Sequence, residues 1–192
     1  MGPWSMRAGK GGRLGVSALL ALGLGLSGQT LAGPGDFKSG PVIEGYGEVA
    51  SRVKQTYPVP KDQHFKVAFD IGNQSEAGQL NRGIESLARF LNMHAAVGVN
   101  PDNIKLALVV HGKAVFDVLN DDAHFKKLAR GNSHSSLLKA LMDNGVRIMV
   151  CGQTAAYYGI DNNLLFPGVE MSLSAMTAHA QLQQQGYSLN PF

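Results

Sequence analysis

The chain reads Val-Arg-Ile-Met-Val-Cys-Gly-Gln-Thr from residue 146 to residue 154. An apolar run that ends at Cys151 and passes through Gly152 into a short helical stretch, residues 154–158, is typical of a buried strand followed directly by a helix. Cys151 is the single cysteine of the 192 residues. It is therefore predicted where the partial positive charge of a helix start favours thiolate over thiol.

The same strand-to-helix pattern recurs on both sides of this stretch. Further strands are predicted at residues 65–71, 104–110, 169–173 and 187–189, and helices at 76–96, 114–120, 123–130, 135–144 and 175–185. Strands that alternate with helices indicate an α/β fold with a mostly parallel sheet and helices on both of its faces. In such sheets, ligands and reactive groups gather beyond the carboxyl ends of the strands. Three loops are predicted at that edge, at residues 72–75, 111–113 and 151–154.

Residues 1–32 have the pattern of a signal peptide. Arg7, Lys10 and Arg13 precede an apolar run, residues 14–26, and Ala32 offers the small residue that a signal peptidase needs. The run is shorter than the roughly 20 residues of a membrane span, and no later segment is long enough. We therefore predict a periplasmic protein without a membrane span after cleavage; the alternative is that the signal is retained as an anchor.

The signal peptide also accounts for the net positive charge. The chain has 17 Lys and Arg against 14 Asp and Glu, and three of the basic residues lie in residues 1–32. The rest of the chain is therefore close to neutral, with no basic stripe for nucleic acid or anionic membranes. One cysteine excludes an internal disulfide framework and any site built from several cysteines.

Residues 33–63 are rich in Gly and Pro and show little periodicity. We predict an extended arm, with one helical turn near residues 48–54, and not a separate domain. Because the arm contains Ile43 and Tyr46, which a disordered linker would avoid, we expect it to pack on its own domain or on a neighbouring subunit. The domain itself is predicted over residues 64–192.

Cys151 has two interpretations. Free cysteine often fills space in a core. A reactive thiolate is the alternative, and it could carry sulfur as a persulfide or form mixed disulfides. In that case the anion would be received by the N–H groups of Gly152, Gln153 and Thr154. A cycle between two thiols of one chain is excluded, because there is no second cysteine.

His111 and Gly112 follow the second predicted strand, so His111 is expected at the same edge as a base or hydrogen-bond donor. The alternative is a histidine bonded to backbone. Gly112 is expected among the ligand-binding residues of this edge. Asn73 could offer a ligand contact from the first loop, although turn formation or helix capping is its plainer role. None of the other histidines is paired at a helical spacing with a second one, so neither a metal site nor a cofactor is predicted.

Two groups of residues resemble a known family. They are Val110-His111-Gly112 with Gly145 to Thr154, and Leu164-Leu165-Phe166-Pro167-Gly168-Val169 with the tail through Leu173-Ser174 to Gly186-Tyr187. Over residues 64–192 the chain resembles the DsrE/DsrF-like family, in its exported branch. The resemblance implies a flavodoxin-like three-layer αβα sandwich with a mainly parallel five-stranded sheet, and assembly into dimers, trimers or hexamers.

Relatives in this family act in sulfur relay and carry sulfur on a cysteine near a strand end, a position that Cys151 matches. The established relay proteins are cytoplasmic, whereas this chain is predicted to be exported. Two functional hypotheses follow. The first is a periplasmic homo-oligomer that binds or transfers sulfane sulfur as a persulfide on Cys151, with a protein or small sulfur compound as donor or acceptor. The second is a non-catalytic oligomeric module that binds a small ligand or protein, in which the cysteine is structural.

Overall fold

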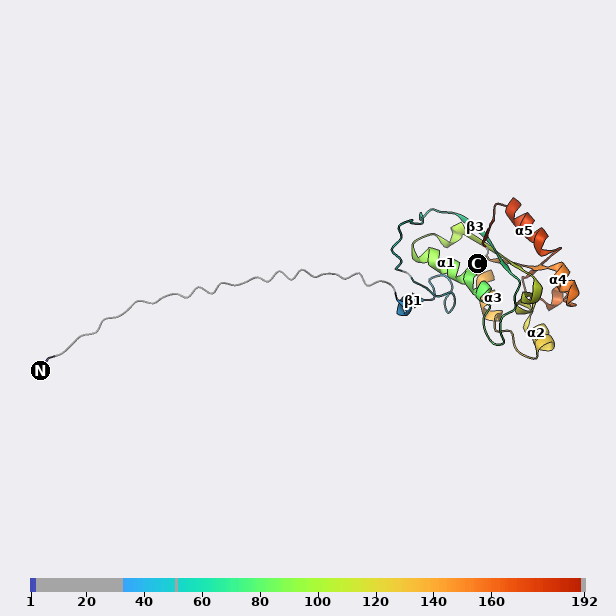
Figure 1. The fold of residues 1–192 in the computed structure, drawn as a ribbon, viewed down its shortest axis with the longest axis horizontal. Helices are drawn as coiled ribbons and strands as arrows, with labels where there is room; N and C mark the ends of the chain where they lie inside the picture. The colour runs from blue at the N-terminus through green and yellow to red at the C-terminus, as the bar shows by residue number, and fades with distance from the viewer. Residues whose placement is uncertain (3–32, 51, 191–192) are drawn as a thin grey trace. The chain divides into compact units, whose positions relative to one another are not determined.

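Five parallel strands form one sheet, in the order β6-β5-β4-β3-β7 (Figure 1). The computed structural model describes residues 1–2, 33–50 and 52–190. The strands are β3 (Phe65–Ile71), β4 (Ile104–Val110), β5 (Arg147–Cys151), β6 (Glu170–Ser172) and β7 (Ser188–Asn190), and the helices are α1 (Arg82–Ala96), α2 (Asp121–Leu128), α3 (Ser135–Asp143), α4 (Gly152–Tyr157) and α5 (Ala175–Gln184). Short 3-10 helices cover Pro34–Asp36, Pro101–Asn103, Gly112–Val118 and Asn162–Leu164. The predicted α/β fold with five strands is confirmed, and every strand pair of this sheet is parallel.

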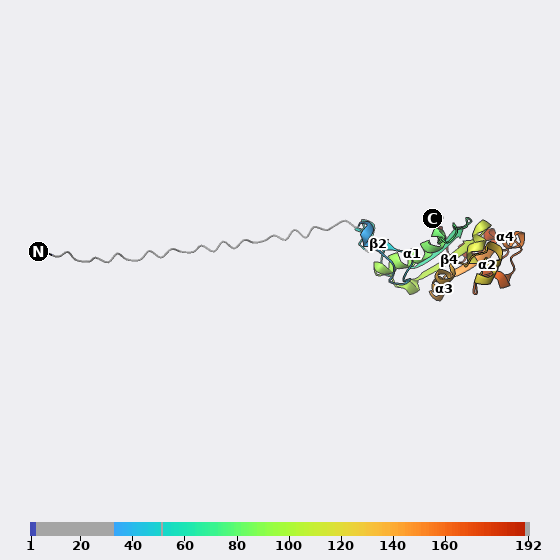
Figure 2. The same ribbon diagram turned by 90° about the horizontal axis from the view of Figure 1, so that it is seen from below.

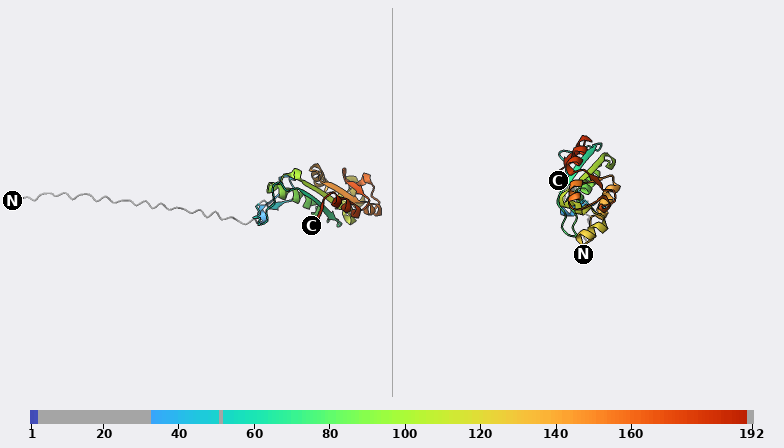
Figure 3. Two further views of the ribbon diagram at one scale, coloured as in Figure 1. Left: turned by 90° about the horizontal axis from the view of Figure 1, so that it is seen from above. Right: turned by 90° about the vertical axis from the view of Figure 1, so that its right-hand side faces the viewer.

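Helices cover both faces of the sheet, as Figures 2 and 3 show from other directions. One face of β3 and β4 (Val67, Phe69, Leu106 and their neighbours) packs in the larger core, together with apolar residues of α1 and α3. The opposite face carries small side chains, such as Ala68 and Ala107, which pack under α5. Because successive side chains of a strand point to opposite faces, this arrangement places residue 70 of β3 on the α5 side of the sheet.

Helix α1 begins later than the sequence pattern predicts. The expected start was residue 76, but residues 76–81 form a turn and loop, and Asn81 caps the helix by accepting a hydrogen bond from the N–H of Gly83. Gly78 has a φ of +75°, a conformation that most residues avoid and that stops a helix from passing through this position. The loop between β3 and α1 is therefore longer than predicted, and the helix is shorter by its first turns.

The arm is docked on its own domain. Its strands β1 (Phe37–Lys38) and β2 (Val49–Ala50) form an antiparallel pair, so the helical turn predicted near residues 48–54 is wrong for Val49–Ala50. Ile43 is 2% exposed and belongs to the larger core. Of the two partners expected for the arm, the structure shows the chain's own domain.

The predicted signal peptide lies outside the described residues, apart from residues 1–2. Within the part of the chain that the structure describes, no helix has the length and apolar character needed to cross a membrane.

Candidate functional site

A cavity of about 350 Å³ opens at the carboxyl edge of the sheet, under the start of α5. Polar and sulfur-bearing side chains from three neighbouring strand ends meet the first turn of that helix there. The lining residues are Asp70, His111, Cys151, Gln153, Thr154, Ser174, Ala175, Met176 and His179. Two of the three loops predicted at this edge, those after β4 and β5, therefore contribute to one cavity.

Cys151 is the last residue of β5 and is 7% exposed. Burial acts to raise the pKa of its thiol, but hydrogen bonds from the Thr154 side chain and from the backbone of Thr154, Ala175 and Gln153 outweigh burial and lower the pKa below its usual value. Because Ala175 is the first residue of α5, the sulfur lies between the starts of α4 and α5. The predicted thiolate-favouring setting of Cys151 is thus present, and α5 adds to it from a distant part of the chain.

Thr154 is oriented by a second contact. Its Oγ1 accepts a hydrogen bond from the N–H of Gly112 at 3.3 Å. A hydroxyl that accepts from one partner keeps its own proton for another. Gly112, which was predicted to contact a ligand, therefore uses its N–H to orient Thr154 toward the sulfur.

Replacing Thr154 by valine is expected to raise the pKa of Cys151, because the side-chain hydrogen bond that stabilises the thiolate is lost. Alkylation by iodoacetamide at pH 7 should slow about fivefold, the factor that a hydrogen bond of about 1 kcal/mol gives. The difference should vanish at high pH, where both proteins are thiolates. The exposed Thr56→Val is the control, and an unchanged pH profile for Thr154→Val would contradict the assignment.

Gly152 lets the chain after β6 approach the cysteine. A Cβ at this position would lie 2.5 Å from the carbonyl oxygen of Ser172 and 3.2 Å from that of Leu173. Any side chain here would push away the segment that leads into α5. The absence of a side chain at Gly152 therefore leaves room for the segment that brings the N–H of Ala175 to the sulfur.

A carboxylate held by two histidines forms the other wall of the cavity. Asp70 Oδ1 lies 2.6 Å from His179 Nε2, and Asp70 Oδ2 lies 2.9 Å from His111 Nε2. Burial acts to raise the pKa of Asp70, but the hydrogen bonds and the charges of His179 and His111 outweigh it and hold the pKa below its usual value. His111 is thus bonded to a carboxylate, and not to backbone as the alternative interpretation had it.

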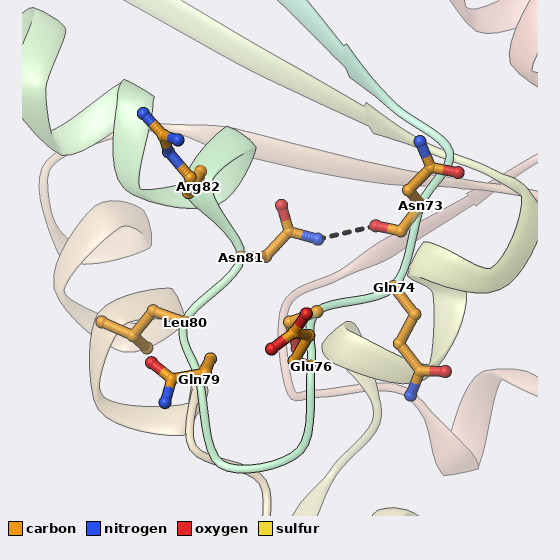
Figure 4. Close-up of a pocket in the computed structure, with 8 residues that line it drawn as sticks. Asn73, Gln74, Glu76, Gln79, Leu80, Asn81 and Arg82 are labelled. Atoms are coloured by element: carbon orange, nitrogen blue, oxygen red, sulfur yellow. Dashed lines mark hydrogen bonds between the residues drawn. The ribbon is translucent and has the colours of Figure 1, made fainter.

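Asn73 lies elsewhere than expected. It borders a different cavity, formed by residues 73–76 and 79–82 (Figure 4). Its backbone oxygen accepts a hydrogen bond of 2.9 Å from the Asn81 side chain, and Asn73 is not among the residues that line the cysteine cavity. This matches the turn-forming alternative, because the loop after β3 bends away from the cysteine toward the start of α1.

Asp70 and His179 are the site residues that sequence reasoning missed. Asp70 is a charged residue inside an apolar strand, a pattern that could have marked it, because an unpaired charge is costly to bury. His179 gives no such local signal, since it reaches the site only through the packing of α5. Among the described residues, no group of three or more His, Cys, Asp or Glu is arranged to hold a metal ion.

Comparison with known proteins supports the fold and the family. The model of the DsrE/DsrF-like family matches residues 66–191. The structure of a protein of unknown function, MTH1491 from Methanobacterium thermoautotrophicum, is similar with a TM-score of 0.52 and 20% identity, covering 67% of this chain and 99% of that chain. The ychN protein from E. coli gives a TM-score of 0.49 and 19% identity over the same shares. No curated protein matches the chain.

The structural likeness and the match to the family model support different conclusions. A structural likeness at 20% identity shows that the α/β fold is shared, and by itself says nothing of activity. The family model is stronger evidence, because it spans most of the chain, includes residues of all five strands of the sheet and covers every residue that lines the cysteine cavity. The chain belongs to the DsrE/DsrF-like family.

Proposed function

We propose that this protein binds and transfers sulfane sulfur as a persulfide on Cys151. The observation that carries the proposal is the setting of the sulfur, which accepts hydrogen bonds from Thr154, Gln153 and Ala175 at the end of β5. A thiolate is the form of cysteine that attacks sulfur, and the same donors can stabilise the persulfide anion that results. Family membership supports a role of the sulfur-relay type.

Export and self-assembly are part of the proposal. The sequence of residues 1–32 supports export to the periplasm by a signal peptide. Met176, which lines the cysteine cavity, is 80% exposed, and Leu173, next to the lining residue Ser174, is 72% exposed. Exposed apolar side chains of this size favour contacts between subunits. We therefore propose a homo-oligomer (dimer, trimer or hexamer) that receives sulfur from a small sulfur compound or a partner protein. Sedimentation of the mature protein tests the assembly.

The proposal predicts a covalent adduct on one residue. Incubation of the reduced protein with a persulfide or polysulfide donor is expected to add the mass of one sulfur atom per chain, and dithiothreitol should remove it. Cys151→Ser should gain nothing, since it lacks the attacking thiolate. Intact-mass spectrometry measures both proteins. Equal mass gains for wild type and Cys151→Ser on incubation would refute the proposed function.

One observation favours the second candidate, a binding module with a structural cysteine. Cys151 is 7% exposed, which is typical of a cysteine that fills space. Such a thiol should react with iodoacetamide no faster at pH 7 than an unfolded cysteine does. The first proposal expects the folded protein to react faster than the urea-unfolded chain at this pH, because the native setting lowers the pKa.

A further inference from the structure

We propose that His179 is the proton donor for the thiolate that leaves when Cys151 takes up sulfur, and that Asp70 and His111 hold it in place. This inference rests on the proposed function and assigns a catalytic role to a residue of α5. Its basis is a cluster of three titratable side chains that shares the cavity with the cysteine.

The position of His179 on α5 brings it near the sulfur. Ala175, whose backbone N–H binds Cys151, lies four residues earlier on the same helix. Residues four apart lie on one face of a helix, one turn from each other. The His179 side chain is 18% exposed, so it lines the cavity beneath the helix and is not a surface group.

The ring of His111 faces away from the sulfur of Cys151. A Cβ on Gly72 would lie 2.6 Å from its ring, so the ring packs against the backbone that follows β3. The strand order β5-β4-β3 puts that side of the ring away from Cys151. His111 thus fixes one oxygen of Asp70, and the other oxygen is left for His179.

Asp70 also determines which nitrogen of each ring carries the exchangeable proton. An ionised carboxylate can only accept hydrogen bonds, so both Nε2 atoms present N–H to it. The second proton of a protonated ring is then on Nδ1. Among the described residues, neither Nδ1 atom has a hydrogen-bond partner. The arrangement therefore leaves one nitrogen of His179 free to give a proton and take it back.

The transfer balances without any other reactant. The Cys151 thiolate attacks the outer sulfur of a persulfide, RSSH; the new bond joins Cys151 Sγ to that sulfur, and the S–S bond of the donor breaks. The electron pair goes to RS⁻, which takes the Nδ1 proton of His179 and leaves as RSH. The new persulfide, a stronger acid than a thiol, returns its proton to the ring. Cys151 is oxidised to the persulfide level as the donor persulfide is reduced to the thiol RSH, so no external oxidant or reductant is needed.

The need for a proton depends on the leaving group, and this gives a selective test. An alkyl thiolate is a poor leaving group without a proton, whereas a nitroaryl thiolate leaves unprotonated. His179→Gln keeps an N–H for Asp70 but cannot supply a proton. We expect it to slow sulfur transfer from cysteine persulfide about 100-fold or more. Reaction with a nitroaryl disulfide should proceed at nearly the wild-type rate.

Two controls separate this role from damage to the site. The thiolate is stabilised by Thr154 and backbone N–H groups, so His179→Gln should keep the wild-type alkylation profile against pH. The exposed His64→Gln should match wild type with every probe. Asp70→Ala, which removes the acceptor that orients the ring, should repeat the selective slowing with the alkyl donor.

The outcomes are distinguishable from failure of the proposed function. If wild type forms no persulfide with any donor, the proposed function fails. If wild type forms it and His179→Gln does so equally fast from cysteine persulfide, the function stands and the proton-donor role is overturned. Equal slowing with both leaving groups would also overturn it, because that pattern indicates distortion of the site.

Discussion

Replacing Asn92 by alanine is expected to lower the free energy of unfolding by about 3–5 kcal/mol. The side chain is fully buried in α1 and makes five hydrogen bonds to the arm. Its Oδ1 accepts from the N–H groups of Val42 and Ile43, and its Nδ2 donates to the carbonyl oxygens of Ile43, Tyr46 and Gly47. Alanine would leave all five backbone groups without this partner.

The arm itself limits the size of the loss. Because the arm can leave the surface and let water bind its backbone, the cost should not exceed that of undocking, which includes exposing Ile43 from the core. Gly47 shows how closely the two parts fit: a Cβ there would lie 2.4 Å from the backbone nitrogen of Arg89. The arm lies outside residues 66–191, which match the family model. Its docking through Asn92 is therefore not part of what the family model describes.

Urea unfolding and limited proteolysis measure the two consequences. The midpoint should fall in Asn92→Ala, and a protease should cut within residues 40–50 of the folded protein faster than in wild type. The exposed Asn144→Ala is the matched control, because its side chain makes one local bond to the carbonyl oxygen of Ala140. A decrease in the free energy of unfolding below about 1 kcal/mol for Asn92→Ala would contradict a structural role for the hydrogen bonds between Asn92 and the arm.

The sheet could be predicted from sequence because its signal is local. Apolar runs such as Ile104–Val110 are long enough to identify strands covered on both faces, and each is bounded by turn residues. The start of α1 could not be placed, since the capping role of Asn81 depends on a loop whose shape comes from tertiary contacts. The pairing of Val49 with Lys38 joins two-residue strands of an arm that shows little periodicity, so no local pattern predicts it.

The site was predictable to the extent that strand ends define it. Cys151 and His111 follow neighbouring parallel strands, so their meeting at one edge follows from topology. Two other features of the site could not be predicted: the hydrogen bond from Gly112 to Thr154, and the position of α5 over the sulfur. Both depend on how side chains and helices pack, which the spacing of residues in the sequence does not determine. His179 lies 109 residues from its partner Asp70, and a separation of this size leaves no local pattern.

Asp117→Ala is expected to destabilise the protein by about 3–5 kcal/mol. The carboxyl group is 1% exposed and accepts three hydrogen bonds. They come from the backbone N–H and the hydroxyl of Ser75 and from the side-chain amide of Asn81. Alanine leaves these donors without their acceptor, and a donor as buried as Asn81 costs about 1–3 kcal/mol when it loses its partner.

The matched control is Asp143→Ala, which removes an exposed carboxylate paired with Lys139 at 2.7 Å. An exposed pair contributes little, so the change should stay below about 1 kcal/mol in urea unfolding. Similar losses for the two variants would contradict a buried structural role for Asp117.

Asp117→Ala also tests whether the stability of the fold and the acidity of Cys151 depend on different residues. Asp117 orders the loop between β3 and α1, and Asn81 of that loop caps α1, so its loss should weaken this side of the sheet. The donors that lower the pKa of Cys151 come from α4 and α5, which do not belong to that loop. The folded fraction of Asp117→Ala should therefore be alkylated with the wild-type dependence on pH. A shifted profile would mean that Asp117 also influences the thiolate, through the loop after β3 or through its own 3-10 helix, Gly112–Val118, whose first residue bonds Thr154.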